Sequence, residues 1–280
     1  MSDRPMNDRP IGVFDSGLGG LTVLRALIDL LPDERVVYFG DTGRFPYGPK
    51  PAEEVLAHAL EITDVLLDHD VKLLVVACNS AAAAALDTLQ AKLDIPVIGV
   101  IEPGLRAAAR VTRSGRIGVI GTVGTVASGA YQRVADDLSG IDLTCAACPG
   151  FVEFVESGDV DSDQVHVLAE RLLAPVRDAT VDTLVLGCTH YPLLARTIGD
   201  VMGRGVVLVS SADETAFAVR DLLTERELLA PGPRSDSTES DSQGDPRHVF
   251  FTSGRVDTFR TLGVRFLGPE VASVEPWQWG

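Results

Sequence analysis

The sequence predicts an α/β protein made of two similar halves, each built around a mostly parallel central sheet. Short aliphatic runs alternate with helix-length segments from end to end, which is the order expected for helices layered on a parallel sheet. Most of these runs are apolar throughout, as in strands that are covered on both faces. Similar segments also recur about 110 residues apart, which indicates an internal duplication.

The individual elements follow from these patterns in chain order. Strands are expected at Ile11–Phe14, Val36–Phe39, Leu73–Ala77, Val97–Val100, Ile117–Ile120, Leu143–Ala146, Leu184–Leu186, Val206–Val209 and His248–Thr252. Helical spacing of apolar residues predicts helices that include Ala52–His69, Asp163–Arg177 and Val256–Leu262. Residues 231–247 contain no aliphatic or aromatic residue, and we interpret them as a mobile surface loop.

The duplication rests on three matches. The segment IGVFDSGLGG at Ile11 resembles IGVIGTVGT at Ile117, and each of Cys78 and Cys188 follows an aliphatic strand. Val97–Val100 corresponds to Val207–Ser210 at the same spacing of about 110 residues. A chance likeness between strand–turn–helix units is the alternative, but the shared spacing favours two related halves.

Composition narrows the class of protein. The 280 residues suffice for about two domains, and 40 acidic against 24 basic residues give a net charge of −16. That charge disfavours non-specific binding to nucleic acids or anionic membranes. No apolar run reaches the length of a membrane span, about 18 residues, and the polar segment before Ile11 does not resemble a signal peptide. We therefore expect a cytoplasmic protein with no direct nucleic-acid or membrane partner, whose four cysteines are free thiols.

The Cys78 and Cys188 thiols are the main candidates for chemistry. Each is expected where a buried strand ends and a helix begins, which is where ligands bind in open α/β sheets. A helix N-terminus favours a thiolate and lowers a thiol's pKa. Asn79-Ser80 and Thr189-His190 follow the two cysteines and supply hydrogen-bond donors for a carboxylate. Simple packing explains one such cysteine, whereas two at duplicate positions indicate function.

Two matched thiols suit a reaction at a stereocentre. If the halves face each other, one thiolate removes a proton from one face of a carbon and the opposite thiol delivers a proton to the other face. Hydrogen bonds from Asn79, Ser80 and Thr189 would stabilise negative charge on a carboxylate next to that carbon.

Other polar residues after strands have weaker signals. Asp15-Ser16 begins a glycine-rich turn that matches neither the dinucleotide nor the P-loop pattern, and Asp15 could cap a helix or exchange protons with a thiol. Thr122 and Thr125 follow the fifth strand and could cap a helix or donate to a ligand. Asp41 lies in the loop that leads to Tyr47-Gly48 and by itself indicates an ordinary turn. Glu156 by itself indicates a solvated carboxylate at a helix end.

No cofactor or metal is expected. The three lysines, Lys50, Lys72 and Lys92, do not follow strands in a way that suggests a pyridoxal-phosphate Schiff base. Cys145 and Cys148 form half of a zinc pattern without a second pair, and we interpret them as packing residues.

Together these motifs resemble the glutamate racemases, within the cofactor-independent aspartate/glutamate racemase superfamily. The resemblance extends through IGVFDSGLGGLTV, YFGDTGRFPYG, VVACNSAAA, IPVIGVIEP, IGVIGT, CPGFVEFVESG, LVLGCTHYPLL and FFTSG. Ser80 stands where the family usually has threonine, and it keeps the hydroxyl.

The resemblance implies two pseudo-symmetric α/β domains with the active site in the cleft between them. Residues 1–101 and 213–280 would form the first domain, and residues 102–212 the second. Its implied activity is interconversion of L- and D-glutamate, which supplies D-glutamate for peptidoglycan.

The resemblance also assigns roles to residues. Cys78 and Cys188 would be the two acid/base residues, with Cys78 serving D-glutamate and Cys188 L-glutamate, and Asp15 and His190 would be their helpers. Glutamate would be bound by a set of residues from the loops that follow the strands: Asp15, Ser16, Tyr47, Gly48, Asn79, Ser80, Thr189 and His190. Asp41 and Glu156 would be auxiliaries, and a homodimer is common in the family. An aspartate or hydantoin racemase, or an amino-acid-sensing protein, remain alternatives.

Overall fold

The computed structural model describes residues 4–232, 247–271 and 273–280. Most of the predicted loop at residues 231–247 lies outside these residues. In the described part of the chain, no helix is both long and apolar enough to cross a membrane.

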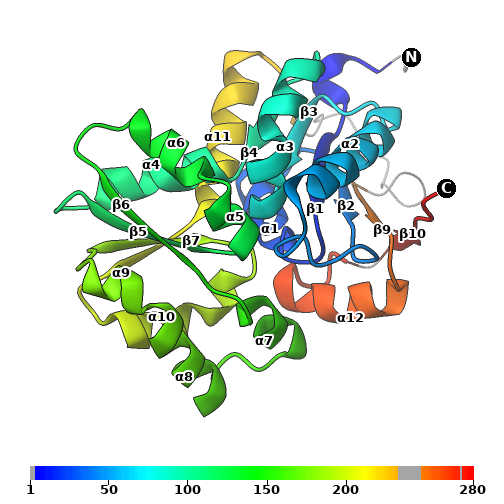
Figure 1. Ribbon diagram of the computed structural model, residues 1–280. Coiled ribbons are helices and arrows are strands. Elements are labelled where there is room, and N and C mark those ends of the chain that lie inside the picture. The colour runs from blue at the N-terminus through cyan, green and yellow to red at the C-terminus, as the bar shows by residue number, and fades with distance from the viewer. Residues whose placement is uncertain (1–3, 233–246, 272) are drawn as a thin grey trace.

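Two separate parallel sheets form the framework (Figure 1). The first has six strands in the order β10-β9-β2-β1-β3-β4, and the second has four in the order β6-β5-β7-β8. The strands are β1 Ile11–Asp15, β2 Val36–Gly40, β3 Leu73–Val76, β4 Val97–Gly99, β5 Arg116–Gly121, β6 Asp142–Ala147, β7 Thr183–Gly187, β8 Val207–Ser210, β9 His248–Thr252 and β10 Val274–Pro276. All neighbouring strands are parallel, so the predicted fold class is confirmed.

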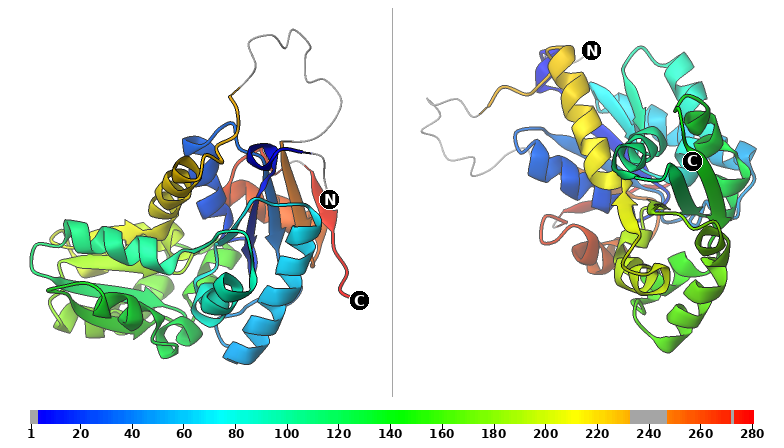
Figure 2. Two further views of the ribbon diagram at one scale, coloured as in Figure 1. Left: turned by 90° about the horizontal axis from the view of Figure 1, so that it is seen from above. Right: turned by 90° about the vertical axis from the view of Figure 1, so that its left-hand side faces the viewer.

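Helices cover the sheets and connect the two halves (Figures 1 and 2). They are α1 Leu21–Leu30, α2 Ala52–Asp68, α3 Asn79–Lys92, α4 Ile101–Val111, α5 Val123–Ala127, α6 Ala130–Asp136, α7 Phe151–Ser157, α8 Asp163–Leu172, α9 Ala174–Asp178, α10 Ala195–Met202, α11 Ser211–Glu225 and α12 Val256–Phe266. Two short 3-10 helices, η1 Met6–Asp8 and η2 Tyr191–Leu194, complete the set. Helix α11 packs against both α1 and α4, so it joins the half built on the first sheet to the half built on the second.

Four neighbouring strands of the first sheet have the same order as the four strands of the second sheet, which supports the duplication. In the first sheet β1 lies between β2 and β3, and β4 follows β3; in the second, β5 lies between β6 and β7, and β8 follows β7. Strands β1, β2, β3 and β7 are buried at every position, as the uninterrupted apolar runs predict. Cys78 and Cys188 follow equivalent strands, β3 and β7.

Two details differ from the sequence prediction. The helix predicted over Asp163–Arg177 is interrupted between α8 and α9, because Pro175 lacks the N–H that a continuous helix would need there. The short strand β10 was not predicted, since three residues ending in proline have no alternation to detect.

Candidate active site

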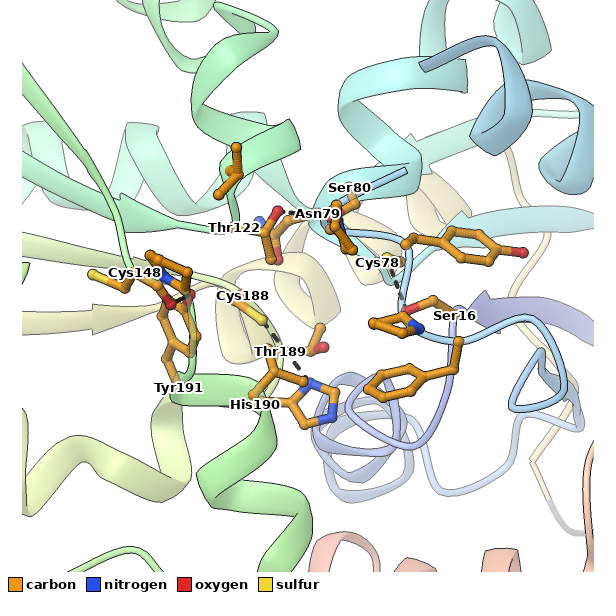
Figure 3. A pocket seen from close by; sticks show the side chains of 18 of the residues that line it. Ser16, Cys78, Asn79, Ser80, Thr122, Cys148, Cys188, Thr189, His190 and Tyr191 are labelled. Atoms are coloured by element: carbon orange, nitrogen blue, oxygen red, sulfur yellow. Dashed lines mark hydrogen bonds between the residues drawn. The ribbon is translucent and has the colours of Figure 1, made fainter. Parts of the chain in front are cut away.

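One pocket lies between the two halves, beyond the carboxyl ends of β1, β3, β5 and β7. Open parallel sheets bind ligands at this edge. Its lining residues are Ser16, Phe45, Pro46, Tyr47, Gly48, Pro49, Cys78, Asn79, Ser80, Thr122, Val123, Cys148, Pro149, Gly150, Val152, Glu153, Cys188, Thr189, His190 and Tyr191. Figure 3 shows Cys78 and Cys188 approaching this space from opposite sides.

Cys78 is held at the start of α3 in a buried environment. It is the N-cap residue of α3, its exposed fraction is 5%, and its thiol donates a hydrogen bond to Ser16 Oγ at 3.5 Å. Burial, together with the nearby Asp15 carboxylate, raises the pKa of Cys78 to about 12. The expectation that the helix N-terminus lowers this pKa is therefore wrong here, because desolvation of the thiolate outweighs the helix dipole.

Cys188 has a different electrostatic environment. Its sulfur lies 3.9 Å from His190 Nδ1, and His190 Nε2 is 3.0 Å from a Glu156 carboxylate oxygen. Burial alone would lower the pKa of His190, but Cys188, Glu156 and Asp15 together raise it to about 10. An imidazolium at neutral pH therefore places positive charge beside the Cys188 sulfur. No α-helix begins here, since the turn 188–190 leads into η2, so the imidazolium takes the role that we assigned to a helix N-terminus.

Asp15 lies behind the pocket wall and connects the two cysteine environments. It is fully buried, it accepts a hydrogen bond from Gly17 N–H at 2.8 Å, and Thr189 Oγ1 donates to it at 3.4 Å. Burial raises the pKa of Asp15, although the positive charge of His190 opposes that shift. Asp15 therefore links the surroundings of Cys78 to Thr189, the residue that follows Cys188.

Hydroxyl and amide groups from both halves meet at the pocket. Ser80 Oγ lies 2.9 Å from Thr122 Oγ1, and Asn79 Nδ2 donates to the Tyr131 hydroxyl at 3.0 Å. Thr122 also caps α5 by accepting a hydrogen bond from Thr125 N–H at 3.2 Å. These bonds fix the donors that face the pocket, and they join α3 of one half to α5 and α6 of the other.

The loop after β2 forms another wall. Tyr47, although almost fully buried, contributes to the pocket lining, and its hydroxyl donates a short hydrogen bond to Asp41. Gly48 O accepts a hydrogen bond from Gly124 N–H at 2.9 Å, and a side chain at Gly48 would meet Thr122 Cβ at 2.8 Å. Glycine is therefore required where this loop touches the second half.

The structure brings most of the predicted site residues to one pocket. Asp15, Asp41, Glu156 and Thr125 are absent from the lining that the described residues form, and they contact lining residues from behind. Glu156 is not simply a solvated helix end, because it bonds His190 and its side chain is only 25% exposed.

Several pocket residues were not predicted. Cys148, which we interpreted as a packing residue, is buried and also lines the pocket beside Tyr191. Tyr191 OH donates to Cys148 O at 3.1 Å. Tyr131, which is not a lining residue but accepts a hydrogen bond from the lining residue Asn79, was not predicted either. Tyr191 directly follows the Cys-Thr-His motif, and this position could have predicted that it lies at the site. The sequence around Tyr131 contains no motif that would have predicted its contact with Asn79.

The described residues contain no group of three or more His, Cys, Asp or Glu side chains arranged to hold a metal ion. Among the described lining residues there is no lysine or arginine. A carboxylate in the pocket would therefore be bound by hydroxyls, amides, backbone N–H groups and the His190 imidazolium.

Comparison with known proteins assigns the family. Residues 11–219 match the model of the Asp/Glu/hydantoin racemase family. The chain belongs to this family. A glutamate racemase from Mycobacterium avium is 51% identical over 267 residues, which cover 95% of each chain.

Solved structures of family members share the fold. A glutamate racemase isoform from Bacillus anthracis superposes with a TM-score of 0.88 at 42% identity, covering 97% of this chain and 98% of that one. The enzyme from Francisella tularensis, solved in complex with D-glutamate, gives a TM-score of 0.86 at 32% identity, with the same coverage of the two chains. The two thiols thus face one pocket in a fold that carries racemases.

Proposed function

We propose that this protein is a glutamate racemase that interconverts L- and D-glutamate by proton transfer at Cα between two cysteines. The observation that carries the proposal is the pair of buried thiols, Cys78 and Cys188, that face one pocket from opposite sides (Figure 3). A racemase must remove a proton from one face of a carbon and add one to the other, and this arrangement supplies an acid/base group on each face.

The electrostatic difference between the thiols supports one direction of the reaction. The His190 imidazolium lies beside the Cys188 sulfur, where its positive charge stabilises negative charge, while burial near Asp15 keeps Cys78 as a thiol at neutral pH. Cys188 then takes the Cα proton of L-glutamate, and the Cys78 S–H delivers its proton to the opposite face, which gives D-glutamate. Turnover leaves Cys188 as a thiol and Cys78 as a thiolate, which is the state needed for the reverse reaction.

The intermediate needs stabilisation, because negative charge develops on the carbon and spreads into the α-carboxylate. Asn79, Ser80, Thr122 and Thr189 present amide and hydroxyl groups at the pocket. In a closed, poorly hydrated site such donors stabilise developing charge more strongly than water does. No step requires a cofactor or a metal.

Glutamate is the proposed substrate on two grounds. The relatives at 51% identity over 95% of the chain are named glutamate racemases, and a structural relative was solved with D-glutamate. The proposed role is supply of D-glutamate for peptidoglycan in the cytoplasm, and we further propose a homodimer as the working form.

The proposal can be tested by following the circular dichroism of L-glutamate incubated with the purified protein after dialysis against EDTA. We expect the signal to decay to zero, since equal amounts of the enantiomers form, and we expect L-aspartate to react much more slowly. Cys78→Ser is the control for a contaminating activity and should leave the signal unchanged. A stable L-glutamate signal with wild-type protein would refute the proposed function, and faster loss of the L-aspartate signal would change the substrate.

A further inference from the structure

A buried carboxylate outside the pocket organises the loop after β2. Asp41 is fully buried, and two groups of the same loop bond to its Oδ2 atom: Arg44 Nε at 2.7 Å and the Tyr47 hydroxyl. Ser253 Oγ donates to the other oxygen, Oδ1, at 2.6 Å. Asp41 thus fixes the two loop residues that flank Phe45 and Pro46, both of which line the pocket.

One more donor to Asp41 comes from the far end of the described chain. Trp279 Nε1 donates to Asp41 Oδ1 at 3.2 Å, and the Arg44 guanidinium carbon lies 3.8 Å from the centre of the Trp279 ring. Trp279 therefore touches both charged residues of this network at once. A guanidinium over an indole face adds cation–π attraction to the hydrogen bond.

Residues 274–280, which we call the Trp segment, are packed against the first sheet. Strand β10 pairs with β9, and the rings of Trp277 and Trp279 both contact Phe39, with centroid distances of 6.1 and 5.4 Å. The segment is thus part of the folded half, and its second tryptophan reaches the loop after β2.

We propose that Trp279 is a positioning residue for the substrate pocket, acting through Asp41 on the loop that carries Tyr47 and Gly48. The inference rests on the proposed function for the identity of the ligand. The loop is held at one end by Asp41 and at the other by the hydrogen bond between Gly48 O and Gly124 N–H. Trp279 stabilises the first of these attachments, and so it holds the pocket wall in place for substrate.

Trp277 provides a matched control. Its indole Nε1 is buried and has no hydrogen-bond partner among the residues that the structure describes, so Trp277→Phe removes the same atoms as Trp279→Phe without removing a bond to Asp41. We expect Trp279→Phe to raise KM for both enantiomers of glutamate about three- to tenfold, with kcat within about twofold of wild type. Loop contacts made equally to substrate and transition state affect KM alone. Trp277→Phe should change KM by less than about twofold.

Equal KM values for the two variants would overturn the proposal, as would a fall in kcat without a rise in KM. Wild-type racemisation of glutamate, measured in parallel, separates this failure from failure of the proposed function. A loss of thermal stability shared by both variants reports only on packing against Phe39 and does not account for a difference in KM.

A second measurement leaves Trp279 intact. The chain has only two tryptophans, so the Trp277→Phe protein contains Trp279 as its single indole. Because coupling between two sites is reciprocal, saturating D-glutamate should reduce quenching of Trp279 fluorescence by acrylamide. In the Trp279→Phe protein, D-glutamate should not change the quenching of Trp277 fluorescence by acrylamide. Quenching of Trp279 that is unaffected by D-glutamate would contradict the proposal.

Discussion

Replacing Glu156 by glutamine tests whether the carboxylate keeps His190 charged. His190 Nε2 lies 3.0 Å from Glu156 Oε1, and the His190 side chain is only 3% exposed. Burial opposes the charged imidazole, while Cys188 and Glu156 raise the pKa of His190 to about 10. Glu156→Gln keeps the shape and the hydrogen-bonding capacity of the side chain but removes its charge.

The size of the effect follows from the contact. An opposite charge at this distance shifts a pKa by about 1 to 3 units, and the 25% exposure of Glu156 favours the lower part of that range. We therefore expect the His190 pKa to fall by about 1 to 2 units, which corresponds to about 1.4 to 2.7 kcal/mol of lost stabilisation of the imidazolium. At a pH near 9 much of the variant would carry a neutral His190 beside Cys188.

The assay is the pH dependence of kcat/KM, together with an NMR titration of labelled histidine. There are five histidines to resolve. The basic limb assigned to His190 should move from about pH 10 to lower pH, by the same amount in both directions of the reaction, because the two enantiomers have equal free energies. Glu153→Gln is the control, since Glu153 is on the same helix α7 and lines the pocket. An unchanged basic limb and an unchanged His190 titration in Glu156→Gln would refute the reasoning.

Two further predictions concern the fold and the join between the halves. Lys72 and Glu34 form an ion pair at 2.6 Å with side-chain exposures of 0% and 3%, so Lys72→Met should cost about 3 to 5 kcal/mol in urea unfolding. The double variant with Glu34→Gln should recover part of this loss, and a cost below about 1 kcal/mol would contradict the prediction. A side chain at Gly19 would meet Thr189 Oγ1 at 2.2 Å and His190 Nδ1 at 2.6 Å, so Gly19→Ala should lower kcat/KM at least about tenfold. Gly205→Ala, with open space around it, should match wild type, and equal activity of the two variants would rule out the close approach.

Much of this architecture could be predicted from local patterns. Strand positions followed from uninterrupted apolar runs, because parallel strands buried on both faces need no polar alternation. The two thiols could be paired from the sequence because duplication places Cys78 and Cys188 after equivalent strands, β3 and β7.

The groups that act from behind the pocket could not be predicted in the same way. The bonds from Trp279 to Asp41, and from Asn79 to Tyr131, join residues far apart in the chain, and no local spacing records them. The electrostatic difference between the thiols also escaped prediction, since it depends on burial and on which charge lies nearby in space. For Cys78, burial and the Asp15 carboxylate raise the pKa of the thiol, and they outweigh the effect of the helix N-terminus that the sequence predicted.

The exchange of solvent deuterium at Cα tests the two-thiol account most directly. In heavy water, wild-type protein acting on L-glutamate should place deuterium at Cα of the D-glutamate product from the first turnovers, with little in the recovered L-glutamate. This is expected because the proton that is removed and the proton that is delivered belong to different thiols. Cys78→Ser and Cys188→Ser should each nearly abolish racemisation while the fold and glutamate binding are retained, since a serine hydroxyl is a far weaker acid/base group near neutral pH. Deuterium that appears equally in substrate and product from the start, or either serine variant racemising at near the wild-type rate, would contradict the account.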